Sequence, residues 1–268
     1  TTVIFANKLI IKKGHTLSNA YLTIDTLTGK IQSYGYQRDF PTTLQQSQQS
    51  SQSQQILHQK LTCDMACAGF IDIHNHGLGG APTVQEYWLS DHTLERLVRY
   101  GTTSVLASLI FSTKDDAKQV LKLVIQRLKS IFGQVRDKLC VVEGIHAEGP
   151  IIATNGGLPD AECDMSVDDF KLLVNEMMPA LKVMTISPSL EKLVQYQRLQ
   201  YLLDLGVKPA LGHDTVADED SILSSLRLAA KKQCQLHITH MYNVSAFHHR
   251  KQTLCNFGLA SRFPKLPS

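Results

Sequence analysis

The sequence lacks long apolar runs and clusters of basic residues, and its first residues do not have the pattern of a secretory leader. The longest apolar runs in the 268-residue chain are far shorter than the roughly 20 residues that cross a bilayer, which argues against a membrane-spanning protein. Lysine and arginine are spread along the chain and the formal net charge is only +3, so nothing indicates nucleic acid or a membrane surface as a partner. The first residues contain no basic segment followed by an apolar core. We therefore expect a cytoplasmic protein.

Paired cysteine motifs are also missing. Six cysteines occur, at positions 63, 67, 140, 163, 234 and 255, and only Cys63 and Cys67 lie close together. A structural zinc site of the four-cysteine kind needs a second pair, which the chain does not supply. Reduced thiols are therefore the simplest interpretation. With 43% hydrophobic and 19% charged residues, the composition is that of an ordinary globular domain.

Two regions differ in pattern. Residues 1–62 are predicted to form a small β unit, with strand-like runs at 8–12 and 20–24 and a hairpin turn at 28–30. Within it, residues 43–55 are almost wholly Gln and Ser, which leaves no apolar groups to bury and predicts a disordered insertion. Whether that insertion is simply tolerated or binds something is left open. Residues 63–268 are predicted to form part of a barrel.

Strand and helix patterns alternate through this second region. Apolar strand-like runs lie at 69–75, 104–109, 139–146, 181–186, 207–212 and 235–240. Amphipathic segments between them predict helices at 91–100, 114–132, 166–177, 190–205 and 218–231. Right-handed crossovers keep successive strands adjacent, so the pattern predicts an α/β fold of the TIM-barrel type. About six of the eight βα units are present.

Metal-ligand side chains stand at the ends of four of these strands: His74, His76, Glu148, His213 and His240. Residues i and i+2 of a strand point the same way, so His74 and His76 share a face, whereas His237 points away from His240. A single histidine at a strand end is more often a core or loop residue. Four such strand ends in one barrel instead predict a site for divalent metal, because imidazole and carboxylate are suitable ligands.

Several stretches resemble one known family. They are residues 69–77 (Gly-Phe-Ile-Asp-Ile-His-Asn-His-Gly), 101–104 (Gly-Thr-Thr-Ser), 146–150 (His-Ala-Glu-Gly-Pro), 212–213 (Gly-His), 239–243 (Thr-His-Met-Tyr-Asn) and 248–250 (His-His-Arg). In order and spacing they resemble the N-acetylglucosamine-6-phosphate deacetylases of the amidohydrolase superfamily. The Glu-Gly-Pro and Thr-His-x-x-Asn stretches are specific to that family, whereas His-x-His marks only the superfamily.

The resemblance implies a cofactor, a substrate and roles for residues. It implies one or two divalent ions, Zn, Fe or similar, with Glu148, His213 and His240 holding the first. It implies a second site at His74 and His76, which some members lack. Asn243, the backbone at Val244, and Arg250 would hold the phosphorylated amino sugar, and the enzyme would release acetate and glucosamine 6-phosphate. Neither nucleic acid nor membrane is implied as a partner, and a homodimer is left open.

The sequence departs from the family pattern in three places. Leu158 stands where the family has a substrate-contacting histidine, and residues 251–253 (Lys-Gln-Thr) replace its Asp/Glu-Pro-Gly. The catalytic Asp that the family carries on strand eight is expected beyond Ser268. The chain as written is therefore expected to be a fragment, a truncated isoform or a degraded copy, and a poor deacetylase.

Two other functions remain open. A cyclic-amide hydrolase of the same superfamily would share the His-x-His pair but would more often use a carbamylated lysine on strand four, and Lys182 lies at the wrong end of that strand. The second alternative is a metal-binding protein without catalytic activity, left after loss of the last strands. A strand ending in Asp, encoded downstream of residue 268, would favour the enzyme.

Overall fold

The computed structural model describes residues 1–41, 59–78 and 85–259. The Gln/Ser-rich segment 43–55 and the last residues of the chain lie outside these described ranges. The chain divides into two compact units, Thr1–Gly69 and Phe70–Ser268. No helix among the described residues is long and apolar enough to cross a membrane.

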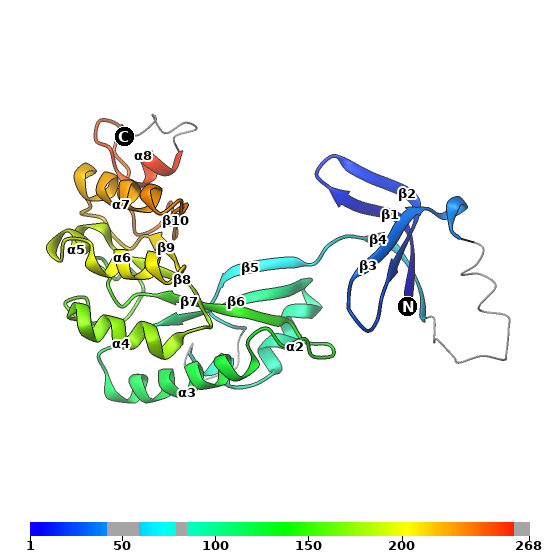
Figure 1. Ribbon diagram of the computed structural model, residues 1–268, viewed down its shortest axis with the longest axis horizontal. Coiled ribbons are helices and arrows are strands. Elements are labelled where there is room, and N and C mark those ends of the chain that lie inside the picture. Colours follow the sequence, from blue (N-terminus) through cyan, green and yellow to red (C-terminus); the bar gives the residue numbers. More distant parts are fainter. Residues whose placement is uncertain (42–58, 79–84, 260–268) are drawn as a thin grey trace. The chain divides into compact units, whose positions relative to one another are not determined.

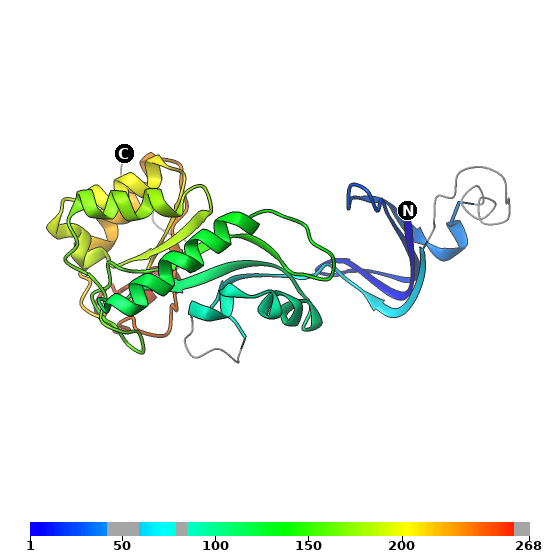
Figure 2. The same cartoon turned by 90° about the horizontal axis from the view of Figure 1, so that it is seen from below.

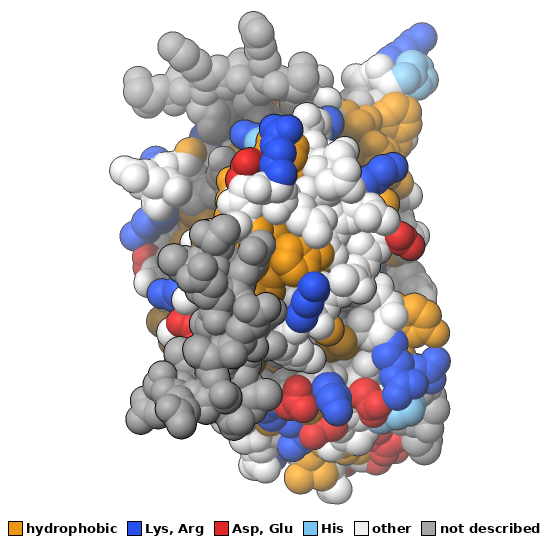
Figure 3. Space-filling view, turned by 90° about the vertical axis from the view of Figure 1, so that its right-hand side faces the viewer, with side chains coloured by type: hydrophobic (Ala, Val, Ile, Leu, Met, Phe, Trp, Pro, Cys, Tyr) orange, Lys and Arg blue, Asp and Glu red, His pale blue; other side chains and the backbone are white. Residues whose placement is uncertain are grey.

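The first unit is a small four-stranded sheet (Figure 1). Its strands are β1 (Thr2–Lys12), β2 (His15–Ile24), β3 (Ile31–Tyr36) and β4 (Gln59–Ala66), in the order β3-β2-β1-β4, and η1 (Gln37–Asp39) follows β3. β1 pairs antiparallel with β2 and parallel with β4. Phe40 lies edge-on against Tyr21, with ring centroids 5.0 Å apart. On the side shown in Figure 3, basic side chains are scattered and form no stripe.

The second unit is a six-stranded parallel sheet with the order β10-β9-β8-β7-β6-β5. Its strands are β5 (Phe70–Asn75), β6 (Thr102–Ile110), β7 (Val141–Glu148), β8 (Leu181–Ile186), β9 (Lys208–Leu211) and β10 (His237–Ile238). Between and after them come η2 (Gln85–Leu89), α2 (His92–Arg99), α3 (Asp115–Ile131), α4 (Val167–Met177), α5 (Pro188–Leu193), α6 (Gln197–Asp204), α7 (Glu219–Lys231) and α8 (Leu254–Leu259). Spatial order follows chain order, which confirms the predicted α/β half-barrel with a small N-terminal sheet.

Each strand of the half-barrel presents two different faces. One face packs under the helices, and α3, α4, α6 and α7 lie in a row in chain order in Figure 1, while Figure 2 shows α3 lengthwise along the sheet. The strand side chains of that face are fully apolar, for example Ala107, Ile145 and Met184, each 0% exposed. Burying such side chains contributes about 1.5–3 kcal/mol for each of the larger ones.

The other face changes character along the strands. Leu106, Val183 and Ala210 form a small apolar cluster of their own. Two residues further on, the same parity brings Ser108 on β6 and Thr185 on β8, both 0% exposed. The strands therefore become polar towards their carboxyl ends, where a parallel barrel carries its functional groups.

One predicted helix is wrong. The segment 190–205 forms two helices, α5 and α6, because Gln195 and Tyr196 both have left-handed backbone, with φ of 52° and 61°. Neither residue is Gly, so the sequence carries no breaker signal. The buried ion pair between Glu191 and Arg198, with Arg198 Nε 2.7 Å from Glu191 Oε1, ties the two helices together. The predicted strand 235–240 is also shorter, being paired only at residues 237–238.

Candidate metal centre

Five side chains from four strand ends converge on one point. Glu148 ends β7 and is 1% exposed. It lies within reach of His74 and His76 from the end of β5, and of His213 and His240, which follow β9 and β10. Two overlapping groups result, one of His74, His76 and Glu148, the other of Glu148, His213 and His240, and the ligand atoms within each lie within 4.8 Å of one another. The structure thus brings together every residue that the sequence proposed as a metal ligand.

The separations suit ligands that share an ion. Glu148 Oε1 lies 3.0 Å from His213 Nε2, 2.5 Å from His240 Nε2 and 3.6 Å from His74 Nε2. Glu148 Oε2 lies 3.0 Å from His76 Nε2. Ligand bonds of about 2.1 Å at a tetrahedral centre place neighbouring ligand atoms roughly 3.4 Å apart, which is near the separations of 3.0–3.6 Å, whereas His240 lies closer to Glu148 than two ligands of one ion would. His74 Nε2 is buried without a hydrogen-bond partner, as expected of an atom directed at an ion.

The protonation states of Glu148 and His74 also suit a metal. Burial acts to raise the pKa of Glu148, but the hydrogen bond from His213 and the neighbouring imidazoles outweigh it and hold the pKa well below the usual range of a carboxyl. Burial lowers the pKa of His74 to about 3, with the charge of His146 adding to the effect. A carboxylate and a neutral imidazole are the forms that bind divalent ions, and the donor set therefore fits such an ion.

His213 is held in one orientation by its backbone surroundings. Its Nδ1 donates to the Thr154 carbonyl at 3.0 Å, which leaves Nε2 turned towards Glu148. Burial acts to lower the pKa of His213, but the hydrogen bonds to Glu148 and to Thr154 outweigh it and raise the pKa. A metal-binding histidine commonly has its second nitrogen fixed in this way.

Ser187 anchors the backbone that carries His213. Its side chain is 0% exposed, and its hydroxyl lies 3.0 Å from both the Gly212 and the His213 carbonyl oxygens. The hydroxyl oxygen accepts a hydrogen bond from the Ala153 amide at 2.9 Å. Gly212 allows Thr239 to approach closely, since a Cβ on Gly212 would meet the Thr239 carbonyl oxygen at 2.9 Å.

His146 is a residue that the sequence reasoning passed over. It precedes Glu148 by two positions on β7, so strand parity alone would have placed it on the same face. Its Nδ1 donates to the Ile73 carbonyl at 2.9 Å and lies 3.2 Å from His74 Nδ1, while its Nε2 lies 3.0 Å from Thr185 Oγ1. Burial lowers the pKa of His146 to about 4. It is therefore a neutral histidine that contacts the ring of His74 through Nδ1.

Three residues around the cluster have strained backbone. His213, His240 and Val244 have φ of 52°, 47° and 52°, in the left-handed region that residues other than Gly seldom adopt. Such residues cost about 1–3 kcal/mol each and concentrate at functional sites. The strain at His240 and His213 turns two strand-end side chains towards Glu148.

The candidate substrate residues lie on a loop beside the cluster. Asn243 donates its amide to the His240 carbonyl at 2.6 Å, and the Val244 carbonyl accepts from the Asp214 amide at 3.0 Å. A Cβ on Gly156 would meet Val244 Cγ2 at 2.7 Å, which brings the loop carrying Leu158 to the same place. Arg250 is exposed, and its amide donates to His248 Nδ1 at 3.0 Å.

Two sequence alternatives lie away from the centre. His237 belongs to neither ligand group. Lys182 Nζ donates to the Pro179 carbonyl at 3.1 Å and lies over the Phe132 ring, 4.7 Å from its centroid. Lys182 therefore does not supply a ligand to the five-residue cluster.

Comparison with solved structures finds the same fold. The structure of N-acetyl-D-glucosamine-6-phosphate deacetylase from Mycobacterium smegmatis has a TM-score of 0.64 and 16% identity, over 95% of this chain and 65% of that one. A mutant of that protein in complex with N-acetyl-D-glucosamine-6-phosphate gives a TM-score of 0.64 and 17% identity, over 95% and 59%. The deacetylase from Thermotoga maritima gives a TM-score of 0.63 and 19% identity, over 96% and 60%.

The likeness is one of fold. No family model matches the sequence, and no curated protein matches it. The chain spans about three fifths of the length of the deacetylases that it resembles. It therefore has the fold found in amidohydrolase structures, with a histidine and glutamate cluster of the kind that binds divalent metal.

Proposed function

We propose that the chain carries the metal site and part of the substrate site of a metal-dependent amidohydrolase. Its reaction is hydrolysis of the acetamide of N-acetylglucosamine 6-phosphate to acetate and glucosamine 6-phosphate. The observation that carries the proposal is the convergence of Glu148 with four histidines at the carboxyl ends of parallel strands, on a fold shared with two deacetylases. A relative has been solved with N-acetyl-D-glucosamine-6-phosphate bound.

The residues have distinct tasks in this proposal. Glu148, His213 and His240 hold one divalent ion, and His74 and His76 with Glu148 hold a second. A bound ion of this kind supplies Lewis-acid polarisation of a carbonyl and activation of water. Thr154 and Ser187 fix His213, and His146 fixes His74. No residue within the described ranges is assigned the proton transfer.

Phosphate recognition is assigned to Arg250 with help from Asn243 and the Val244 backbone. Arginine suits this task because its planar fork presents paired donors to phosphate oxygens. The loop from His240 to Arg250 begins at a metal ligand and is paired to Asp214 through Ser245. A sugar held there by its phosphate would present its acetamide to the cluster. The cyclic-amide alternative is less favoured because Lys182 lies away from the cluster and Glu148 occupies the bridging position.

The assignment can be tested with the full-length protein. Arg250→Ala should raise KM for N-acetylglucosamine 6-phosphate about ten- to hundredfold, because a charge-assisted hydrogen bond contributes about 1.5–3 kcal/mol. KM for unphosphorylated N-acetylglucosamine should barely change. Arg99→Ala, at an exposed arginine of α2, is the matched control. An equal effect on both substrates would remove phosphate recognition from the account, and absence of acetate release by the unaltered full-length protein would favour a non-catalytic metal-binding protein.

A further inference from the structure

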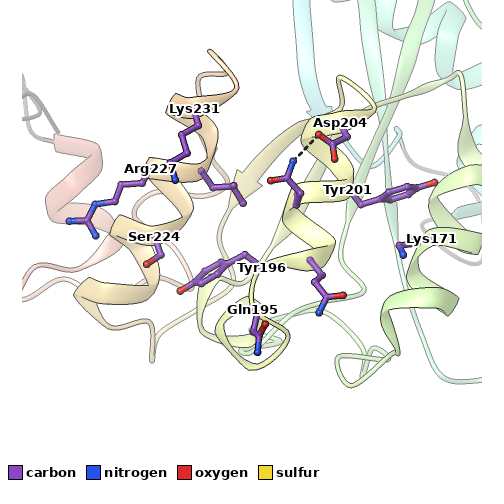
Figure 4. Close-up of a pocket in the computed structure, with 11 residues that line it drawn as sticks. Lys171, Gln195, Tyr196, Tyr201, Asp204, Ser224, Arg227 and Lys231 are labelled. Carbon is purple, nitrogen blue, oxygen red and sulfur yellow. Dashed lines mark hydrogen bonds between the residues drawn. The ribbon is translucent and has the colours of Figure 1, made fainter. Parts of the chain in front are cut away.

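A groove lies among the helices of the second unit, apart from the candidate metal cluster. It has a volume of about 610 Å³ and is bordered by α4, α6 and α7 (Figure 4). The residues that matter for its chemistry are Lys171, Gln195, Tyr196, Asp204, Arg227 and Lys231. None of them is a candidate metal ligand or substrate residue of the deacetylase site, and the volume is that of an ordinary small-molecule site.

The charges of the groove favour an anion. Three cations line it, Lys171, Arg227 and Lys231, against one carboxylate, Asp204, and Lys171 is paired with Asp168 at 3.5 Å. Asp204 already pairs with Lys232 at 2.7 Å and accepts from Gln200 at 2.7 Å. Among the described residues, no carboxylate lies within ion-pair distance of Arg227 or Lys231. Two cations one helical turn apart on α7 are therefore without an ion-pair partner; Figure 4 shows the Arg227 side chain extended away from Tyr196, so that it would turn towards Lys231 to hold a phosphate there.

The neutral lining favours a ligand with hydroxyl groups. Gln195, Gln197 and Ser224 add amide and hydroxyl groups to the groove. The Tyr196 hydroxyl is buried without a hydrogen-bond partner, and Figure 4 shows it directed across the groove towards Ser224 on α7. A buried hydroxyl without a partner is rare in folded proteins, and it is the kind of group that a polar ligand satisfies.

The turn that presents Tyr196 is firmly built. Gln195 and Tyr196 are both left-handed, and such strain persists only where the surroundings enforce it. The Tyr196 amide donates to the Glu191 carbonyl at 2.9 Å. The Glu191 carboxylate accepts from Arg198 Nε at 2.7 Å and from the Leu199 amide at 2.8 Å, and both side chains are almost fully buried. The tyrosine is thus held by a rigid support.

We propose that this groove is a binding site for a phosphorylated sugar, with the phosphate on Arg227 and Lys231. The sugar hydroxyls bind the glutamines and the Tyr196 hydroxyl. The site is separate from the metal centre, so the proposal does not depend on the reaction assigned to that centre.

Calorimetric titration of the full-length protein with ribose 5-phosphate, ribose and inorganic phosphate tests this site. The protein carries Arg250→Gln throughout, so that binding at the deacetylase phosphate site does not contribute. Ribose 5-phosphate should bind, and Arg227→Gln with Lys231→Gln should weaken it by about tenfold or more, since charge-assisted hydrogen bonds are lost. The matched control, Lys8→Gln with Lys13→Gln, removes the same charge from the first unit and should leave binding unchanged.

A second variant distinguishes recognition of the sugar from recognition of the phosphate. Tyr196→Phe removes a hydroxyl that has no hydrogen-bond partner among the described residues, so folding should be retained. This variant should lower the affinity for ribose 5-phosphate severalfold and leave the affinity for inorganic phosphate unchanged. Binding of ribose 5-phosphate that survives the double substitution on α7 would overturn the proposal. So would equal affinity for inorganic phosphate and ribose 5-phosphate, which would reveal an anion site without sugar recognition.

Discussion

At the scale of single residues, the centre depends on groups that never touch the metal ligand atoms. Ser187 has no sequence signal of its own, because a serine before a proline is more simply explained as a helix boundary. Its buried hydroxyl nevertheless fixes both carbonyls beside His213. The candidate ligands themselves were predictable from strand parity, since His-x-His and a strand-end glutamate are visible patterns. Their supports are not, because hydrogen bonds to backbone carbonyls depend on the fold.

Ser187→Ala should therefore weaken metal binding without altering any ligand. The substitution leaves the Ala153 amide without its acceptor, and the free energy of unfolding should fall by about 1–3 kcal/mol. Metal affinity should fall about 10- to 100-fold, as is usual when the support of a ligand is lost. Urea unfolding and metal competition titration measure the two effects. Ser225→Ala is the control, because the buried Ser225 hydroxyl donates to the Ser221 carbonyl of its own helix, α7, and contacts none of the candidate ligands; equal losses in both variants would show that Ser187 has no special role.

At the scale of elements, the helix after β8 is where sequence reasoning failed. Residues 190–205 contain no Gly or Pro, so propensity favours one helix. The two helices that form are set by a buried ion pair, Glu191 with Arg198, and by the left-handed turn between them. By contrast, the helix predicted at 166–177 forms as α4, and the Ser166 hydroxyl accepts from the Asp169 amide at its start. Local caps can be inferred from sequence, whereas tertiary ion pairs cannot.

Arg198→Met tests how far the stability of the α5–α6 arrangement depends on this ion pair. Removing one partner of a buried pair leaves a buried charge and costs about 3–5 kcal/mol. Burial raises the pKa of Glu191, and loss of Arg198 removes the main opposing effect. A carboxyl with a raised pKa binds its proton more readily in the folded state, so its stabilising effect is greatest at low pH and is lost as pH rises through the folded pKa.

The variant should therefore be less destabilised at pH 5 than at pH 8 in urea unfolding. Glu191→Gln with Arg198→Met is the matched control, since it removes the charge and should abolish this difference. A destabilisation of equal size at both pH values would mean that Glu191 is not carrying an unpaired charge in the single variant.

At the scale of the whole molecule, the six-stranded sheet has two open edges. Within the described residues, β5 pairs only with β6, and β10 only with β9. Apolar side chains of β5 are exposed, with Phe70 at 66%, Ile71 at 72% and Ile73 at 42%. The number of strands and their order were predictable because the βα alternation repeats. The exposure of the β5 side chains could not be predicted from their own sequence, because it is as apolar as that of a buried strand.

The 268-residue chain, expressed alone, should associate through the β5 edge, because unpaired apolar strands recruit other strands. Ile71→Lys with Ile73→Lys should shift it towards monomer in sedimentation velocity. Leu123→Lys with Leu172→Lys adds the same charge at exposed helix positions and should have little effect. A chain extended by two further βα units should be monodisperse without these changes. A monomeric 268-residue chain would show that the open edge is harmless.

The central claim is that Glu148, His213 and His240 form a divalent metal site, and metal content tests it most directly. The full-length protein, purified without chelator and analysed by inductively coupled plasma mass spectrometry, should contain about one to two divalent ions per chain. Glu148→Gln, His213→Ala and His240→Ala should each lose most of that metal while remaining folded by circular dichroism. His237→Ala, two residues before Thr239 and outside both ligand groups, should keep it. If Glu148→Gln and His213→Ala retain the metal content of the unaltered protein, the cluster is not the metal site and the account fails.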